Sequence, residues 1–217
     1  MEATVHKQVR INTGGVVLPG ELLIPTHAKA LIIFCHGSGS SYNSPRNQMV
    51  ASYLRKQGFA TLLFDLLTAA EDEYIGNRFN TDLLTQRLIG ATRWAERQPE
   101  VQHAPIGYFG ASTGAAAALQ AAAQLPQVQA VVSRGGRPDL AGAALPQVRA
   151  AVLLIVGGND GEVLRLNEKA AARLHCVHEL TVVPGATHLF EEPGKLTQVA
   201  LLALDWFRQH IHQQAEV

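Results

Sequence analysis

The chain has 217 residues, 47% of them hydrophobic and 17% charged, and this length and composition favour one buried core over two. Eighteen basic residues balance eighteen acidic ones, so there is no general positive field to attract nucleic acid or an anionic membrane. We therefore expect a single domain over residues 1–217, with neither nucleic acid nor a membrane among its partners.

The amino-terminal residues Met1 to Lys7 lack the basic and then apolar layout of a signal peptide, and no apolar run approaches the ~18 residues that span a bilayer. The chain has only two cysteines, Cys35 and Cys176, whereas a disulfide framework would need more of them. These features predict a cytoplasmic protein.

The first two predicted elements are strands over residues 5–11 and 16–24, joined by the turn-forming run Asn12-Thr13-Gly14-Gly15, which predicts an antiparallel hairpin. Almost continuous apolar runs follow. Such runs are typical of strands in a parallel sheet that is covered on both faces, and they lie at residues 30–35, 60–64, 106–109, 130–132, 151–156 and 180–183.

Stretches with helical periodicity separate these runs, at residues 47–57, 81–97, 115–124, 162–174 and 196–212. Alternation of strands and helices at these lengths predicts βαβ crossovers and a three-layer α/β fold, with a mostly parallel eight-stranded sheet that includes the hairpin. Residues 66–80 show no clear period, so we expect either a solvated loop or a mobile segment over a functional site. The interval between residues 132 and 151 is too short for a large lid domain.

Gly110-Ala111-Ser112-Thr113-Gly114 stands between the predicted strand at 106–109 and the alanine-rich helix at 115–124. A Gly-x-Ser-x-Gly sequence in this context forms a sharp turn that strains the serine backbone and exposes its Oγ, while the glycines let strand and helix approach. The motif therefore predicts Ser112 as a nucleophile.

Two more residues with side chains suited to catalysis follow later strands, at the edge of a parallel sheet where ligands bind. Asp160 ends Gly157-Gly158-Asn159-Asp160, and His188 ends Pro184-Gly185-Ala186-Thr187-His188. A serine hydroxyl needs a base, and the base needs an orienting carboxylate, so we expect His188 as general base and acid and Asp160 as its partner. An ordinary turn role for Asp160 stays open, and Asp65 is the alternative acid.

Together with His36-Gly37-Ser38-Gly39 and the run from Gly185 to Phe190, these motifs resemble, from about residue 15 onward, the α/β-hydrolases of the dienelactone-hydrolase-like group. In finer detail the chain is similar to the hydrolase unit attached to phosphoribosyltransferase domains in some bacterial proteins. The resemblance implies an α/β-hydrolase fold and a serine hydrolase that cleaves carboxylic esters, lactones or thioesters through an acyl-enzyme. Dienelactone hydrolases proper carry a cysteine where this chain has Ser112, so dienelactone cleavage itself is not implied.

By motif position, the backbone N–H groups of Ser38 and Thr113 are expected to form the oxyanion hole. Gly37 and His36 belong to the same loop and are expected near the substrate. For His36 we expect a role in shaping the loop rather than one as the base.

Ser133-Arg134-Gly135-Gly136-Arg137-Pro138-Asp139 follows the strand next after the nucleophile. Because a planar guanidinium suits carboxylate or phosphate, one hypothesis is that Arg134 holds an anionic group of the substrate. The alternative is that Arg134 and Arg137 anchor loops, through backbone carbonyls or through Asp139.

Other chemistries find no motif: His-Glu-x-x-His, Cys-x-x-Cys and Gly-x-x-x-x-Gly-Lys are all absent, so we expect no metal and no cofactor. The expected partner is a small-molecule substrate, and a homodimer is left open. Two alternatives for function also stay open: an acyltransferase or perhydrolase that uses the same acyl-enzyme, and a non-catalytic ligand-binding protein on this fold.

Overall fold

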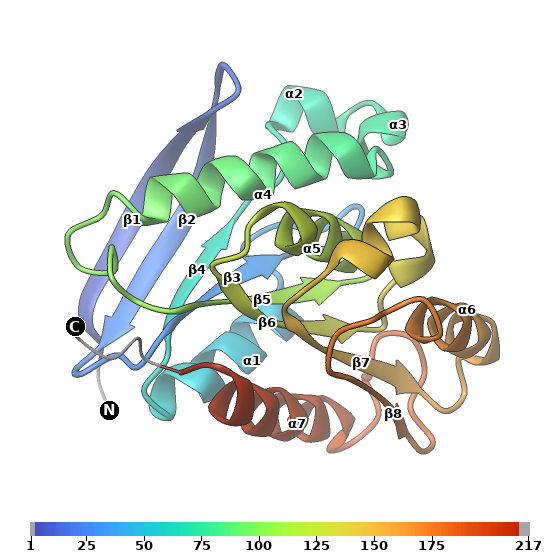
Figure 1. Cartoon of the computed structure of the whole chain (residues 1–217). Coiled ribbons are helices and arrows are strands. Elements are labelled where there is room, and N and C mark those ends of the chain that lie inside the picture. The colour runs from blue at the N-terminus through green and yellow to red at the C-terminus, as the bar shows by residue number, and fades with distance from the viewer. Residues whose placement is uncertain (1–2, 213–217) are drawn as a thin grey trace.

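A twisted, mostly parallel sheet forms the centre of the molecule in the computed structural model, which describes residues 3–212 (Figure 1). The sheet has eight strands in the order β1-β2-β4-β3-β5-β6-β7-β8. The strands are β1 (Ala3–Thr13), β2 (Val16–Pro25), β3 (Leu31–Cys35), β4 (Ala60–Phe64), β5 (Ile106–Ala111), β6 (Val128–Arg134), β7 (Ala151–Gly157) and β8 (His178–Val183).

The strand pairing agrees with the sequence pattern. β1 and β2 form the predicted antiparallel hairpin, and β2 also pairs antiparallel with β4, whereas the remaining pairs are parallel. Every residue of β3, β4, β5 and β7 is buried. Continuous burial is the reason why these strands read as unbroken apolar runs, because helices cover both faces of the sheet.

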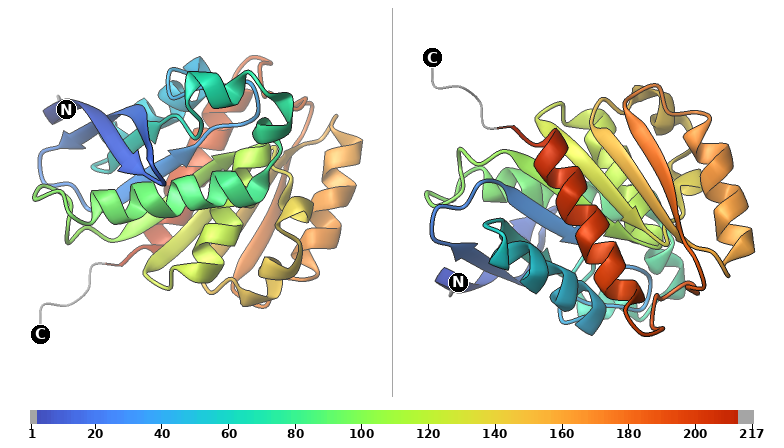
Figure 2. Two further views of the ribbon diagram at one scale, coloured as in Figure 1. Left: turned by 90° about the horizontal axis from the view of Figure 1, so that it is seen from above. Right: turned by 90° about the horizontal axis from the view of Figure 1, so that it is seen from below.

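The helices lie in two layers, as the two views in Figure 2 show. One core layer joins the sheet to α4, α5, η1 and α6, and the other joins it to α1 and α7. The helices are α1 (Pro45–Lys56), α2 (Ala69–Asp72), α3 (Ile75–Arg78), α4 (Thr81–Ala95), α5 (Thr113–Gln124), the 3₁₀ segment η1 (Pro138–Gln147), α6 (Gly161–Ala171) and α7 (Lys195–His210). This is the predicted three-layer arrangement.

Residues 66–80 are not the loop without helices that their lack of periodicity indicated. They form α2 and α3, each a single turn, which is too short to show a 3.6-residue period. A capping box at Thr68 begins α2, and Arg78 Nη2 lies 2.9 Å from Asp72 Oδ2. Arg87 of α4 holds Glu71 at 2.6 Å, so the segment is tied to the body of the protein.

Within the described residues, the chain between β6 and β7 forms only η1, and no lid is evident there. No helix between residues 3 and 212 is both long and apolar enough to cross a bilayer. The expectation of a single domain over 1–217 also includes Met1, Glu2 and residues 213–217, which lie outside the described residues.

Candidate active site

Ser112 occupies the turn between β5 and α5 in a strained conformation. Its φ is +49° and its ψ −122°, a region that non-glycine residues rarely adopt. A Cβ added at Gly114 would lie 2.4 Å from the carbonyl oxygens of Cys35 and His36, so strand β3 touches the elbow too closely for any side chain there. The Ser112 side chain does not cap α5, and its hydroxyl therefore is not consumed by the helix it precedes.

The loop after β3 lies directly against this serine. A Cβ added at Gly37 would be 3.0 Å from Ser112 Cβ, which shows how closely the loop and the elbow approach. The backbone N–H of Ser38 donates to Thr113 Oγ1 at 3.0 Å, and the Thr113 side chain is buried. The structure thus brings together the two expected oxyanion donors, with the Thr113 hydroxyl accepting from one of them.

His36 is buried and both its ring nitrogens have partners within the protein. Nε2 accepts from the backbone N–H of Leu66 at 3.0 Å, and Nδ1 lies 2.9 Å from the Gly37 carbonyl, to which it donates when the ring is neutral. Burial lowers the pKa of His36, since the charged form is poorly solvated there. This geometry supports the loop-shaping role, and it leaves no ring nitrogen free for a substrate.

Asp160 and His188 meet across the loops that follow β7 and β8. His188 Nδ1 lies 2.7 Å from Asp160 Oδ2, and the Asn159 N–H donates to the Ala186 carbonyl at 2.9 Å, which joins the two loops. Asp65, the alternative acid, instead accepts from the Tyr42 N–H at 2.8 Å. The carboxylate and imidazole are therefore in the relation that orients a histidine base, with Nδ1 toward the acid, and no hydrogen bond to Nε2 is found among the described residues.

Gly135 connects the histidine loop to the elbow. A Cβ added there would lie 2.9 Å from the His188 carbonyl oxygen, and the preceding carbonyl, that of Arg134, accepts from the Ser112 N–H at 3.3 Å. No hydrogen bond joins Ser112 Oγ to His188 among the described residues, and such bonds are often long before substrate binds. The three predicted catalytic residues thus gather at one end of the sheet.

A small cavity of about 10 Å³ opens beside the loop after β3. Gly37, Ser38 and Thr113 line it, together with residues of α2, α3 and α4 that include Arg78 and Leu84. Sequence reasoning missed these last two residues as site residues. For Arg78 the only signal is the position of residues 66–80 between a strand end and a helix, which allows a segment over the site. Leu84, in the predicted helix at 81–97, gives no such signal.

The two arginines after β6 are placed differently from one another. Arg137 makes two hydrogen bonds to Asp139, at 2.9 and 2.8 Å, as the loop-anchoring alternative predicts. Arg134 is buried, with 5% of its surface exposed, and its Nη2 donates to Asn47 Oδ1 of α1 at 3.3 Å. Arg134 does not line the cavity beside Ser38, so the structure does not bring it to that cavity as a substrate contact.

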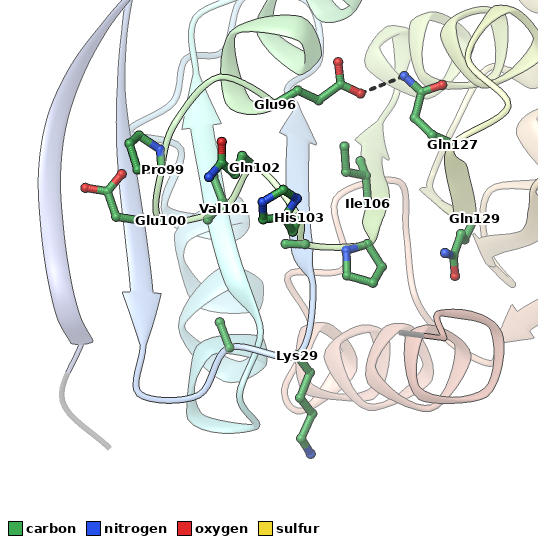
Figure 3. A pocket seen from close by; sticks show the side chains of 13 residues that line it. Lys29, Glu96, Pro99, Glu100, Val101, Gln102, His103, Ile106, Gln127 and Gln129 are labelled. Carbon is green, nitrogen blue, oxygen red and sulfur yellow. Dashed lines mark hydrogen bonds between the residues drawn. The ribbon is translucent and has the colours of Figure 1, made fainter. Parts of the chain in front are cut away.

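A larger hollow of about 1140 Å³ lies at the opposite end of the sheet, where β3, β5 and β6 begin (Figure 3). Its lining includes Lys29, His103 and Gln129, and Gln127 Nε2 donates to Glu96 Oε1 at 2.8 Å. None of the predicted site residues lines this hollow. Chemistry at Ser112 therefore does not take place there. No group of three or more His, Cys, Asp or Glu side chains with metal-binding geometry occurs in the described part of the chain.

Comparison with known proteins gives consistent matches. The model of the dienelactone hydrolase family matches residues 18–210. A Mycobacterium tuberculosis H37Rv protein named "Putative phosphoribosyl transferase" is 55% identical over 206 residues, which are 94% of this chain and 46% of that protein. The chain thus spans about half the length of the curated relatives it matches.

Among solved structures, a dienelactone hydrolase from Anabaena variabilis is 52% identical, with a TM-score of 0.92 over 96% of this chain and 99% of that one. An alpha-beta serine hydrolase homologue from Coxiella burnetii has a TM-score of 0.77 over 92% of this chain and 96% of its own. Its 19% identity shows a shared fold only.

Proposed function

Because the chain belongs to the dienelactone hydrolase family, we propose that it is a serine hydrolase that cleaves carboxylic esters, lactones or thioesters of small substrates through an acyl-enzyme. The observation that carries the proposal is the 2.7 Å contact between His188 Nδ1 and Asp160 Oδ2, at the same end of the sheet as the strained elbow of Ser112. A base with an oriented ring and a serine with an exposed hydroxyl are what acyl transfer needs.

In this mechanism Ser112 Oγ attacks the acyl carbonyl while His188 Nε2 takes its proton. Asp160 stabilises the imidazolium that forms, and the imidazolium then gives the proton to the leaving group. Water, activated in turn by His188, attacks the acyl-enzyme and releases the acid. Each step uses the same three side chains, and the serine is regenerated.

The backbone N–H groups of Thr113 and Ser38 stabilise the negative charge of the tetrahedral intermediate. The N–H of Thr113 begins α5, and the N–H of Ser38 belongs to the loop that His36 fixes and donates to Thr113 Oγ1. The Ser38 N–H must leave Thr113 Oγ1 to reach the oxyanion. Loss of one such donor costs about 2.7–4 kcal/mol of transition-state stabilisation, or about 10²–10³-fold in kcat.

Covalent labelling with a fluorophosphonate probe tests the proposal. We expect the folded wild type to be labelled on Ser112, and Ser112→Ala to lose both labelling and ester hydrolysis, the latter on the order of 10³–10⁶-fold. Ser52→Ala on α1 is a matched control that should be labelled like the wild type. Equal labelling of wild type and Ser112→Ala would disprove the serine hydrolase.

A panel of p-nitrophenyl esters, lactones and acyl thioesters, with Ser112→Ala as blank, identifies the acyl group. Product analysis with added alcohol or peroxide shows whether the acyl group passes to water or to another acceptor. Labelling without turnover of any ester in the panel, with or without an acceptor, would favour a ligand-binding protein on this fold.

A further inference from the structure

Arg134 is an unusual residue for the interior of this fold. It ends β6 and shares a face of the sheet with Ala130 and Val132, which pack in the core layer under α1 and α7. Its guanidinium points to the first turn of α1, where Nη2 donates to Asn47 Oδ1. Only 5% of the residue is exposed. A full positive charge is therefore held almost entirely out of water.

This charge has no carboxylate partner. Among the described residues, Arg134 forms no ion pair, and its Nε is buried without a hydrogen-bond acceptor. Burial, and then the positive charge of nearby Arg46, lowers the pKa of Arg134 to about 10, so the group is still charged at neutral pH. Buried charges are normally paired, because isolation from water costs several kcal/mol. No residue between 3 and 212 supplies the counter-charge.

Arg46 adds a second positive group at the same place. Its Nη1 lies 2.9 Å from Glu191 Oε1, but its Nε is buried without a partner, as in Arg134. Arg46 stands in the first turn of α1, which has no acidic residue. The amino end of a 12-residue helix carries partial positive charge of its own. Arg134 and Arg46 thus both lie at the first turn of α1, whose Pro45 has no N–H and whose Asn47 N–H donates to Ser44 Oγ.

We propose that a small oxyanion, a phosphate or carboxylate group, binds between the guanidinium groups of Arg134 and Arg46 and the first turn of α1. The Nε–H groups of Arg134 and Arg46, both without an acceptor among the described residues, are charged donors of the kind that oxyanions prefer. The site lies on the α1 and α7 side of the sheet, whereas Leu84 of α4 lines the small cavity on the other side. It does not depend on the proposed hydrolase activity.

Glu191 belongs to the turn that follows His188, and its side chain is 62% exposed. An anion at Arg46 would compete with this carboxylate. Binding of an anion at the site would therefore release the loop that holds His188 from α1, because Glu191 would lose its contact with Arg46.

Thermal unfolding with inorganic phosphate as the probe tests the site. A hundredfold excess of phosphate over its Kd should raise the melting temperature of the wild type by about 5–10 °C, because the ligand binds only the folded state. Arg134→Met should lose this rise. Without phosphate, the variant should unfold near the wild-type temperature, because the removal of a buried charge without a counter-charge is offset by the loss of the donor to Asn47 Oδ1.

Arg137→Met is the matched control, because Arg137 belongs to the same loop but has Asp139 as its partner, and it should keep the response to phosphate. Glu191→Gln is a second variant at an exposed position, and it should bind phosphate several-fold more tightly because Arg46 is released. Sodium chloride at matched ionic strength measures the general effect of salt. An equal rise for wild type and Arg134→Met, or an unchanged Kd in Glu191→Gln, would overturn the proposal.

The same titration, repeated after the fluorophosphonate has reacted with Ser112, identifies the source of the anion. An unchanged phosphate Kd means a free ion at a separate site, and a Kd weakened tenfold or more means an anionic part of the substrate. Both outcomes require the site. If Ser112 is not labelled at all, the proposed hydrolase fails while the comparison of wild type with Arg134→Met still stands.

Discussion

His36 shows how much one buried ring can do for a loop without taking part in chemistry. Its two nitrogens join Leu66, at the end of β4, to Gly37, so the loop that carries Ser38 cannot move independently of the neighbouring strand. A buried donor without an acceptor costs about 1–3 kcal/mol. Removal of the His36 ring would leave the Leu66 N–H in this state, so the ring stabilises the loop by about that amount.

The pH dependence of stability tests this role. The pKa of His36 is lowered in the folded state, so below the unfolded value of about 6.5 the unfolded chain binds more protons. Wild-type stability should therefore fall as pH drops from 7.5 to 5.5, with His36 contributing up to about 1.4 kcal/mol per pH unit. His36→Gln should be less stable at pH 7.5, and its deficit should shrink at pH 5.5. Urea unfolding at several pH values measures this.

Two comparisons make the result specific to His36. His103→Gln, in an exposed loop, should keep the wild-type pH dependence. Burial raises the pKa of nearby Asp65, which acts in the opposite sense at lower pH, so the comparison stays above pH 5.5. A deficit for His36→Gln that does not change with pH would contradict the assignment.

At the scale of elements, the elbow depends on how closely β5, α5 and β3 approach one another. Added Cβ atoms at Gly110 and Gly114 would both meet backbone at about the same distance, 2.5 Å from Ala115 Cα in the first case and 2.4 Å from the Cys35 carbonyl oxygen in the second. Backbone cannot rotate away as a side chain does. The glycines of the motif are thus required by packing. For this reason the motif predicts the close approach of the strands and the helix as well as the nucleophile.

Gly114→Ala should therefore destabilise the protein and displace the elbow from the loop after β3. We expect a loss of about 1–3 kcal/mol or more in the free energy of unfolding, from overpacking against the carbonyls of Cys35 and His36. The kcat/KM for an ester substrate should fall as well, because Ser112 and the oxyanion donors would move apart. Urea unfolding and steady-state kinetics check the two effects.

The matched control is Gly161→Ala at the start of α6, where an added Cβ meets nothing within 4 Å. It should be neutral or gain about 0.4–1 kcal/mol, because alanine restricts the unfolded chain. Equal stability of the two variants would show that the close approach at Gly114 is not needed.

At the scale of the whole molecule, β3 lies within the sheet between β4 and β5, under a helical layer on each face. Cys35 ends this strand with no exposed surface, and burial raises the pKa of its thiol. Cys176 is a free cysteine that is only half-buried. The reactivity of the Cys35 thiol therefore measures opening of the core, whereas that of Cys176 measures accessibility near the surface.

Thiol labelling should separate them. In the folded protein Cys176 should react, while Cys35 should react at least about 10³–10⁴-fold more slowly, because it becomes accessible only when the sheet opens. In Cys176→Ser, the remaining reaction should accelerate with urea in parallel with global unfolding. Reaction of Cys35 at a rate similar to that of Cys176 in native buffer would mean that β3 opens locally.

Much of this fold was predictable because its signals are local. The apolar run at residues 60–64 is β4 residue for residue, and the predicted helix at 115–124 differs from α5 by one turn or less at its start. Burial on both faces leaves a continuous apolar run, and burial on one face leaves a 3.6-residue period. Elements α2 and α3 leave neither signal in four residues each, and so they were missed.

The amino-acid sequence by itself determined the order of strands and helices, the elbow at Ser112, and the positions of Asp160 and His188 after later strands, because each follows from periodicity or from a motif at a strand end. Only the tertiary structure decided which side chains meet. The contact of His188 with Asp160, the tie of His36 to Leu66 and the direction of Arg134 toward α1 join residues 28 to 87 positions apart. Such contacts depend on how strands are ordered in the sheet and which face each side chain takes, and neither is a local property.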